Sequence, residues 1–212
     1  MRDIPAFTTE NGVAGIVLKE IPYNQTAYVT IHDSLDPDAL LQECLGFCKA
    51  VGAQRVFVAE YPGIQNIALH SRILRMSASK AQLAESDAYI FPVTEQTAER
   101  FRNLYNEKMA ETDHAAFLSV QGMKELLKKG SAYFIHKNEQ LLGIGIGSGD
   151  TLDAVASTVA GAGETVVRTM CHALSGESVF LEVSSTNTRA IRLYERLGFA
   201  VIGEGSRWYK IL

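Results

Sequence analysis

The chain has 212 residues, of which 47% are hydrophobic and 21% charged. This composition is ordinary for a globular protein that buries its core in one or two domains. A formal net charge of −4 gives no broad basic surface, so we expect no nucleic-acid partner. No apolar run reaches the roughly 20 residues that span a bilayer. With only three cysteines and no signal peptide, we expect a cytoplasmic protein with no membrane partner.

The first part of the chain predicts a hairpin, a helix and two further strands. Asp36-Pro37 supplies an N-cap residue followed by a first-turn proline, which is typical of a helix start. A polar segment rich in Ser and Ala follows and extends to about residue 86. In chain order, we predict strands at 15–21 and 27–32, a helix at 36–51, and strands at 55–59 and 72–76.

The second part predicts an alternation of strands and helices. Thr94 is the expected N-cap of its first helix, and Gly130 closes the next one. Asn138-Glu139 is the expected hairpin turn. We predict strands at 89–93, 132–136, 141–147, 152–158, 179–183 and 206–211, and helices at 94–111, 117–129, 164–173 and 187–198.

Glycine and isoleucine alternate over residues 143–149 in a run that superficially suggests a dinucleotide-binding loop. That motif would need a glycine at Ser148 or Asp150 and a helix directly after it. Neither is present. We interpret the run as a strand whose glycine side packs closely against another element.

The two halves of the chain resemble each other. Residues 48–58 align without gaps on residues 171–181, and residues 71–76 align on 206–211. The first half lacks a segment about as long as one short helix. We therefore expect a truncated copy over 1–84, a complete domain over 87–212, and the chemistry in the second half.

The C-terminal segment carries the most specific pattern in the chain. Residues 187–199 read Asn-Thr-Arg-Ala-Ile-Arg-Leu-Tyr-Glu-Arg-Leu-Gly-Phe. This stretch, with the strand before it and the strand after it, resembles the C-terminal signature of the GNAT N-acetyltransferase superfamily. The resemblance implies an α/β (α+β) fold with a mixed, mostly antiparallel sheet flanked by helices, and an N-terminal partial repeat of that fold.

A glycine loop precedes the helix predicted at 164–173. Free backbone N–H groups at a helix N-terminus bind phosphate, and glycines allow close approach. The family places its pyrophosphate loop here, but its usual Arg or Gln is Thr158 in this chain and Glu164 adds a negative charge. The resemblance implies that acetyl-coenzyme A is bound by Val159, Gly161, Ala162, Gly163, Glu164 and Thr165, by backbone groups of Ala156 and Ser157, and by Asn187.

Tyr194 is the expected catalytic acid. A phenol has a pKa near that of an alkyl thiol, so it can protonate a leaving thiolate, and the family's tyrosine at this position has that role. Glu182 and Asp153, on strands flanking the expected site, are the candidate general bases. The histidines and cysteines show no metal-ligand spacing, so no metal is expected.

Two classes of function remain open at this point, and within the enzyme class a longer acyl donor is a further alternative. The first is an acetyl-coenzyme A-dependent N-acetyltransferase that acts on a primary amine of a small molecule or peptide. The alternative is a non-catalytic acyl-coenzyme A sensor or interaction module, which the departure at Thr158 favours. The acceptor cannot be identified from the sequence, and a homodimer is considered as the assembly.

Overall fold

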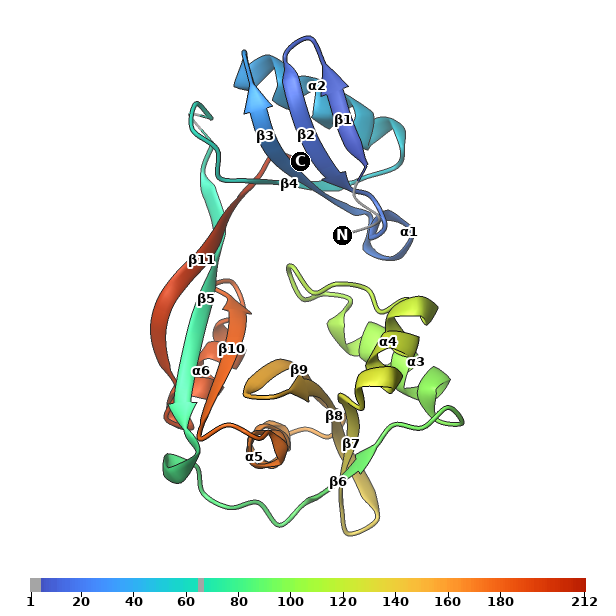
Figure 1. The fold of residues 1–212 in the computed structure, drawn as a ribbon, viewed down its shortest axis with the longest axis vertical. Helices are drawn as coiled ribbons and strands as arrows, with labels where there is room; N and C mark the ends of the chain where they lie inside the picture. The colour runs from blue at the N-terminus through green and yellow to red at the C-terminus, as the bar shows by residue number, and fades with distance from the viewer. Residues whose placement is uncertain (1–4, 65–66) are drawn as a thin grey trace. The chain divides into compact units, whose positions relative to one another are not determined.

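The computed structural model describes residues 5–64 and 67–212. The chain forms two compact units, the first made of residues 1–73 and 205–212 and the second of residues 74–204. Within the described residues, no helix has both the length and the apolar character needed to cross a membrane. The two units are described separately below (Figure 1).

The first unit is a sheet with one long helix packed on it and a second helix of a single turn. Its strands lie in the order β1-β2-β3-β4-β11, and β3 and β4 are parallel. Cys44 and Cys48 of the long helix are buried in the core formed with Val29 and Val58 of the sheet. The elements are β1 (Ala6–Thr9), β2 (Gly12–Val17), α1 (Ile21–Asn24), β3 (Thr26–Ser34), α2 (Pro37–Ala50), β4 (Arg55–Ala59) and the end of β11 (Ala200–Lys210).

The second unit has a larger sheet with helices on both faces (Figure 1). Its strands lie in the order β5-β10-β9-β8-β7-β6. The elements are β5 (Leu69–Ser79), η1 (Lys80–Gln82), β6 (Tyr89–Pro92), α3 (Ala98–Met109), α4 (Val120–Lys129), β7 (Ala132–Lys137), β8 (Gln140–Ser148), β9 (Thr151–Ser157), α5 (Gly163–Ala173), β10 (Ser178–Ser184) and α6 (Thr188–Arg196).

Two separate cores fill the two sides of this sheet. One contains Met170 of α5 and Tyr194 of α6, together with Leu181 of β10. The other contains Phe101 of α3 and Met123 of α4, together with Ile144 of β8. The observed architecture is the mixed, mostly antiparallel sheet flanked by helices that the sequence predicted.

The Gly-Ile alternation forms the middle of β8, as predicted. Ile144 and Ile146 belong to the core under α3 and α4. The glycines face α5, where a Cβ at Gly145 would lie 2.4 Å from the Met170 sulfur and one at Gly143 would lie 2.7 Å from a Val166 methyl. Side chains of normal size would therefore push α5 off the sheet.

Most predicted elements are present, but several have other bounds: the helix expected at 117–129 begins at Val120 and the strand expected at 206–211 begins at Ala200. The helix expected at 94–111 begins at Ala98 with Thr97 as its N-cap residue. Thr94 is not the cap: its backbone N–H instead donates a hydrogen bond to the Thr97 hydroxyl oxygen, at 3.0 Å. β1 and α1 were not predicted, because each has only four residues and shows no clear periodicity.

The compact units have different bounds from the halves expected from the repeat. The core under α5 and α6 includes Met76, Ala78 and Leu83, which precede residue 84. The last residues of β11 pair with β4 of the first unit. The compact units are defined by packing, whereas the expected halves are defined by the internal repeat. The units therefore do not test the division into 1–84 and 87–212, which remains a prediction.

Candidate functional site

Strands β9 and β10 are parallel neighbours that separate after a short stretch of pairing. Their register contains only Phe180 opposite Thr151 and Leu181 opposite Leu152. Beyond these pairs the two strands diverge (Figure 1). Parallel strands in a sheet normally continue pairing, so this divergence leaves a row of backbone groups available to a ligand.

The register of β9 identifies which amides face the divergence. Thr158 donates its N–H to Leu142 on β8, and residues at every second position share that direction. The amide of Ala156 therefore faces β8, whereas those of Val155 and Ser157 face the side of β10. The sequence suggested the amides of Ala156 and Ser157 as donors to the acetyl oxygen. The register favours Ser157 for this role and, in place of Ala156, favours Val155.

Asp153 is the extra residue of a β-bulge in β9. The register shifts so that Leu152 lies opposite Gly147 and Ala154 opposite Ile146, which leaves Asp153 without a partner on β8. Bulges re-aim side chains and interrupt pairing. Partial desolvation raises the pKa of the Asp153 carboxyl, and the nearby Lys129 opposes this effect.

Glu182, the other candidate base, is an exposed residue of β10 and pairs with Arg75 of β5. The distance from Arg75 Nε to Glu182 Oε1 is 3.2 Å, and both side chains are more than half exposed. An exposed ion pair of this kind is weak and exchanges readily. The structure therefore gives Glu182 a direct ion pair with Arg75, whereas Asp153 lies in the electrostatic field of Lys129.

The predicted glycine loop connects β9 to α5. Gly161 adopts a φ of +81°, a left-handed conformation that favours glycine. The N-cap residue of α5 is Ala162, which has no side chain able to cap the helix. The amides of Gly163, Glu164 and Thr165 therefore have no intrahelical acceptor, and the loop presents them at the positive end of the helix dipole.

The negative charge of Glu164 is offset locally. Arg168, one turn further along α5, lies 2.6 Å from the Glu164 carboxylate. This (i, i+4) pair reduces the repulsion that Glu164 would exert on an anion at the helix start. The hydroxyl of Thr158 donates to the carbonyl of Leu141 at 2.6 Å, so it stabilises the strand end.

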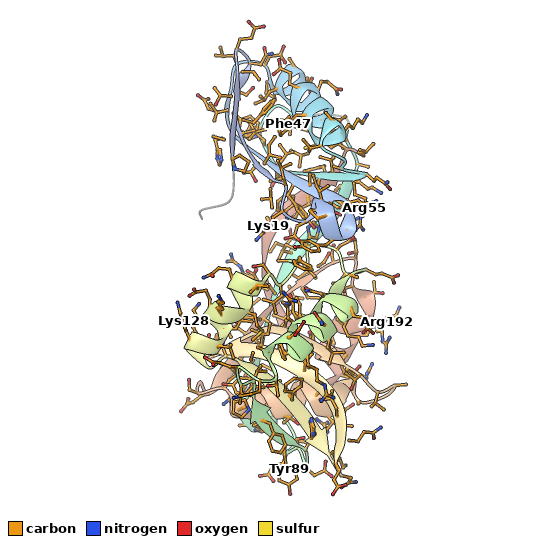
Figure 2. All side chains as sticks on the ribbon, turned by 90° about the vertical axis from the view of Figure 1, so that its right-hand side faces the viewer. Lys19, Phe47, Arg55, Tyr89, Lys128 and Arg192 are labelled. Atoms are coloured by element: carbon orange, nitrogen blue, oxygen red, sulfur yellow. The ribbon has the colours of Figure 1, made fainter. Side chains whose placement is uncertain are left out.

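Asn187 is the N-cap of α6. Its side-chain oxygen accepts the Ala190 N–H at 3.1 Å, which confirms the capping role predicted from the sequence. Its backbone N–H donates to the Ser184 carbonyl at 2.9 Å, and its side-chain Nδ2 has no hydrogen bond to any described residue. Arg192 is exposed and points away from the surface of α6 (Figure 2).

Gly198 ends α6 in the left-handed conformation, with a φ of +93°. Gly198 donates to Glu195 and Phe199 donates to Tyr194, each at 3.0 Å, which together make a Schellman motif. The rings of Tyr194 and Phe199 lie 5.7 Å apart. The Gly-Phe pair of the signature therefore fixes both the end of the helix and the position of the Tyr194 ring.

Tyr194 is a buried residue, 9% exposed. Burial raises the pKa of its phenol to about 12, and the adjacent Cys171 adds to this effect. Its ring belongs to the core that also contains Val183 of β10 and receives Val155 of β9. No hydrogen bond to its hydroxyl occurs within the described part of the chain.

One contact near the divergence was not predicted. The Thr186 hydroxyl, in the loop between β10 and α6, donates to the Asp113 carboxylate at 3.1 Å. Asp113 lies in the loop between α3 and α4. No sequence pattern signals this contact, because the two residues are 73 positions apart.

The cysteines are free and buried, and none belongs to a metal site. Cys44 and Cys48 lie in the first core, and Cys171 lies in the core under α5. Among residues 5–64 and 67–212 no group of three or more His, Cys, Asp or Glu residues is placed to hold a metal ion.

Comparison with protein families gives one match, to the FR47-like protein family over residues 146–209. The match covers β9, α5, β10 and α6, which together form the candidate site. A search of curated protein sequences found no match.

Solved structures resemble the whole chain at low sequence identity. A conserved protein of unknown function from Staphylococcus epidermidis is 13% identical, with 99% of this chain and 94% of that chain covered and a TM-score of 0.58. A GCN5-related N-acetyltransferase from Sphaerobacter thermophilus is 12% identical, with coverages of 93% and 75% and a TM-score of 0.57.

A GCN5-related N-acetyltransferase from Anabaena variabilis gives the same picture. It is 13% identical, with 94% of this chain and 59% of that chain covered and a TM-score of 0.59. At these identities the likeness establishes the fold alone. The fold is that of GNAT acetyltransferases, and the family match lies over the part of it that carries the site.

Proposed function

We propose that this protein is an acetyl-coenzyme A-dependent N-acetyltransferase that transfers the acetyl group directly to a primary amine. The observation that carries the proposal is the divergence of β9 and β10 directly before an uncapped helix N-terminus. A divergence of parallel strands exposes backbone donors to a thioester, and the helix start supplies donors to a diphosphate. The GNAT-type fold supports both assignments.

In this proposal the backbone holds the coenzyme. The residues from Val159 to Thr165 surround the diphosphate, mainly through the amides at the start of α5. The amides of Val155 and Ser157 donate to the acetyl carbonyl oxygen as its negative charge develops. Asn187 keeps its capping bond and uses its free side-chain N–H groups toward the coenzyme.

Side chains transfer the protons. Asp153 or Glu182 accepts a proton from the acceptor ammonium, directly or through water, and the raised pKa of Asp153 favours it as the base. Once the amine nitrogen has bonded to the carbonyl carbon, Tyr194 gives its proton to the sulfur as the carbon–sulfur bond breaks. The nitrogen, which still carries one extra proton after the attack, loses it through water, and this proton restores the Tyr194 phenol. No residue is required to form a covalent intermediate.

The burial of Tyr194 suits an acid for a buried thiolate. Its pKa of about 12 keeps the phenol protonated at neutral pH. A thiol in the same low-polarity surroundings is equally hard to ionise, as the pKa of about 12 for the buried Cys171 illustrates. The proton is therefore transferred between groups of similar basicity.

We also infer that the first half is a partial copy of the second. In each half an antiparallel strand pair (β2-β3, β8-β9) is followed by a helix and by a strand parallel to the last strand of that pair. The shared connectivity supports the repeat read from residues 48–58 and 171–181. The truncated copy is then expected to have no active site of its own.

The test of the proposed function is thiol release from acetyl-coenzyme A with a panel of primary amines. The wild-type protein should turn over with at least one amine, and Tyr194→Phe should lower kcat by about 100-fold. Removing a hydroxyl that has no hydrogen bond to a described residue should leave the affinity for coenzyme A and the free energy of unfolding nearly unchanged.

Tyr133→Phe is the matched control. Its hydroxyl donates to the Gly130 carbonyl at 2.6 Å, away from the divergence, so kcat should stay at the wild-type value. An unaltered kcat in Tyr194→Phe would remove Tyr194 from the mechanism.

A second candidate function is a non-catalytic acyl-coenzyme A sensor. The observation in its favour is Thr158, which stands where the family's basic residue is expected and whose hydroxyl donates to the Leu141 carbonyl at the strand end. Tight binding of acetyl-coenzyme A without turnover across a broad amine panel would establish the sensor.

A further inference from the structure

A hollow on the second unit lies between α3 and the ends of β8 and β9. Arg100, Asn103 and Leu104 of α3 line one side of it, and Leu141, Thr158 and Val159 line the other. Thr158 and Val159 are the first residues of the glycine loop. The hollow therefore reaches the same loop that the divergence of β9 and β10 reaches from the opposite side of β9.

Arg100 is the cationic side chain in the lining of this hollow. Its guanidinium carbon lies 5.9 Å from the centre of the Phe134 ring, a cation–π arrangement that holds the group without using its N–H donors. Arg100 forms no ion pair with any described residue, and its side chain is exposed. The planar array of donors is therefore available to an anion that presents two oxygens.

The position of the hollow limits what Arg100 can contact. β9 separates the hollow from the amides of Val155 and Ser157, which face β10. The hollow and the divergence both adjoin the loop that follows residue 157, because Thr158 and Val159 line the hollow. A ligand that lies in the divergence can thus reach Arg100 with the part of it that lies on the loop.

We propose that Arg100 binds the diphosphate of the coenzyme and supplies the positive charge that Thr158 does not. This inference rests on the proposed function, because it assigns one contact of the same coenzyme. The missing basic residue of the loop is replaced by an arginine from α3, 58 positions earlier in the chain. The residues of the loop itself do not indicate this arginine, because it lies so far away in the sequence.

Two carboxylates also line the hollow, and they suggest the competing occupant, a cationic amine. Glu107 is 3.0 Å from the Lys108 ammonium, which offsets its charge. Glu99 has no such partner among the described ion pairs and opposes an anion in the hollow. The two occupants therefore predict opposite effects for neutralising Glu99.

The experiment measures dissociation constants of the full-length chain by calorimetry for three probes. Coenzyme A carries the diphosphate and a 3′-phosphate, dephospho-coenzyme A carries the diphosphate alone, and pantetheine carries neither. Arg100→Gln should weaken binding of the first two about tenfold, as expected for one charge-assisted contact, and leave pantetheine unchanged. Arg100→Lys should keep part of the affinity, and Lys124→Gln, an exposed change on α4, should have no effect.

The Glu99→Gln variant is the second part of the experiment. If the hollow holds the diphosphate, coenzyme A should bind about two- to threefold more tightly because a repulsive charge has been removed. The proposal is overturned if Arg100→Gln binds coenzyme A like the wild type. It is equally overturned if Glu99→Gln raises the KM of an amine and leaves coenzyme A affinity unchanged, because the hollow then belongs to the acceptor. A wild-type protein that binds none of the three probes would reject the proposed function itself.

Discussion

Several ionisable side chains are buried in the core of the first unit and in the core under α5 and α6, and they keep their protons well above neutral pH. Burial raises the pKa of Cys44 to about 12, with a smaller contribution from Cys48. It raises the pKa of Cys171 to about 12 as well. These thiols pack as small apolar groups, and with such pKa values they are unreactive toward oxidants at neutral pH.

The buried thiols predict a loss of stability in alkali. Unfolded cysteines release protons near pH 9, whereas Cys44 and Cys171 retain theirs in the folded state, so above that pH the unfolded state binds fewer protons. Their contribution is complete below pH 9 and is lost as the pH rises toward 12. The free energy of unfolding should fall by about 1.4 kcal/mol per pH unit for each thiol.

Urea unfolding between pH 7.5 and 10.5, under reducing conditions, measures this slope. Cys44→Ala should start from a lower stability, because a buried side chain is truncated, but should lose less of it with rising pH. A pH-independent free energy of unfolding across this range would contradict the prediction.

At the scale of the elements, the start of α6 combines a structural and a proposed binding role in one side chain. Asn187→Asp keeps the oxygen that accepts the Ala190 N–H but removes the side-chain donor. Its free energy of unfolding should stay close to that of the wild type, whereas Asn187→Ala should lose about 1 kcal/mol. Both variants should bind coenzyme A more weakly in a direct titration.

The comparison of these two variants separates the roles. If Asn187→Asp binds coenzyme A as tightly as the wild type, the residue is a cap alone.

The contact of β8 with α5 depends on the glycines of the strand. A Cβ at Gly143 would lie 2.5 Å from the Ala156 carbonyl oxygen and 2.7 Å from Val166, whereas the three atoms nearest to one at Gly145 all belong to the flexible Met170 side chain. Gly143→Ala should therefore destabilise the protein by about 3 kcal/mol and more than Gly145→Ala does.

Gly46→Ala is the matched control for these substitutions. Nothing lies within 4 Å of a Cβ at this exposed position of α2, so alanine should stabilise the protein by up to about 1 kcal/mol. Urea denaturation of the three variants gives the order, and equal losses at Gly143 and Gly145 would be inconsistent with these contacts.

At the scale of the whole molecule, the core under α5 and α6 depends on residues from the first part of the chain. Met76 and Ala78 of β5 are buried in it at 0% and 4% exposure, and Leu83 at 6%. β5 is also the neighbour of β10 in the sheet order. A cut at residue 84 removes a strand and part of the core that supports α5 and α6.

Two truncations test this dependence. Deleting residues 1–84 should abolish cooperative unfolding and soluble expression, because it exposes the edge of β10 and leaves cavities in the core. Deleting residues 1–68 keeps β5 intact and should retain a cooperative unfolding transition by circular dichroism. Equal cooperativity in the two truncations would show that β5 is dispensable for the core under α5 and α6.

Local patterns predicted the elements around the site because their determinants lie within a few residues. The N-cap Asn187, the terminating Gly198 and the loop with Gly161 are short-range features, and the structure has each in its expected place. The start of α3 was misplaced because Thr94 and Thr97 are both acceptable caps in sequence. The catalytic and coenzyme-binding roles proposed for these residues stay predictions.

The sequence by itself determined the identity and order of most strands and helices, because periodicity and capping act locally. Tertiary structure alone decided how far β9 pairs with β10, and hence which amides of β9 are open. It also decided that Arg100 and Thr158 line the same hollow and that Thr186 donates a hydrogen bond to Asp113. Such pairings join residues far apart in the chain, and the packing of helices on a twisted sheet fixes them rather than any pattern along the backbone.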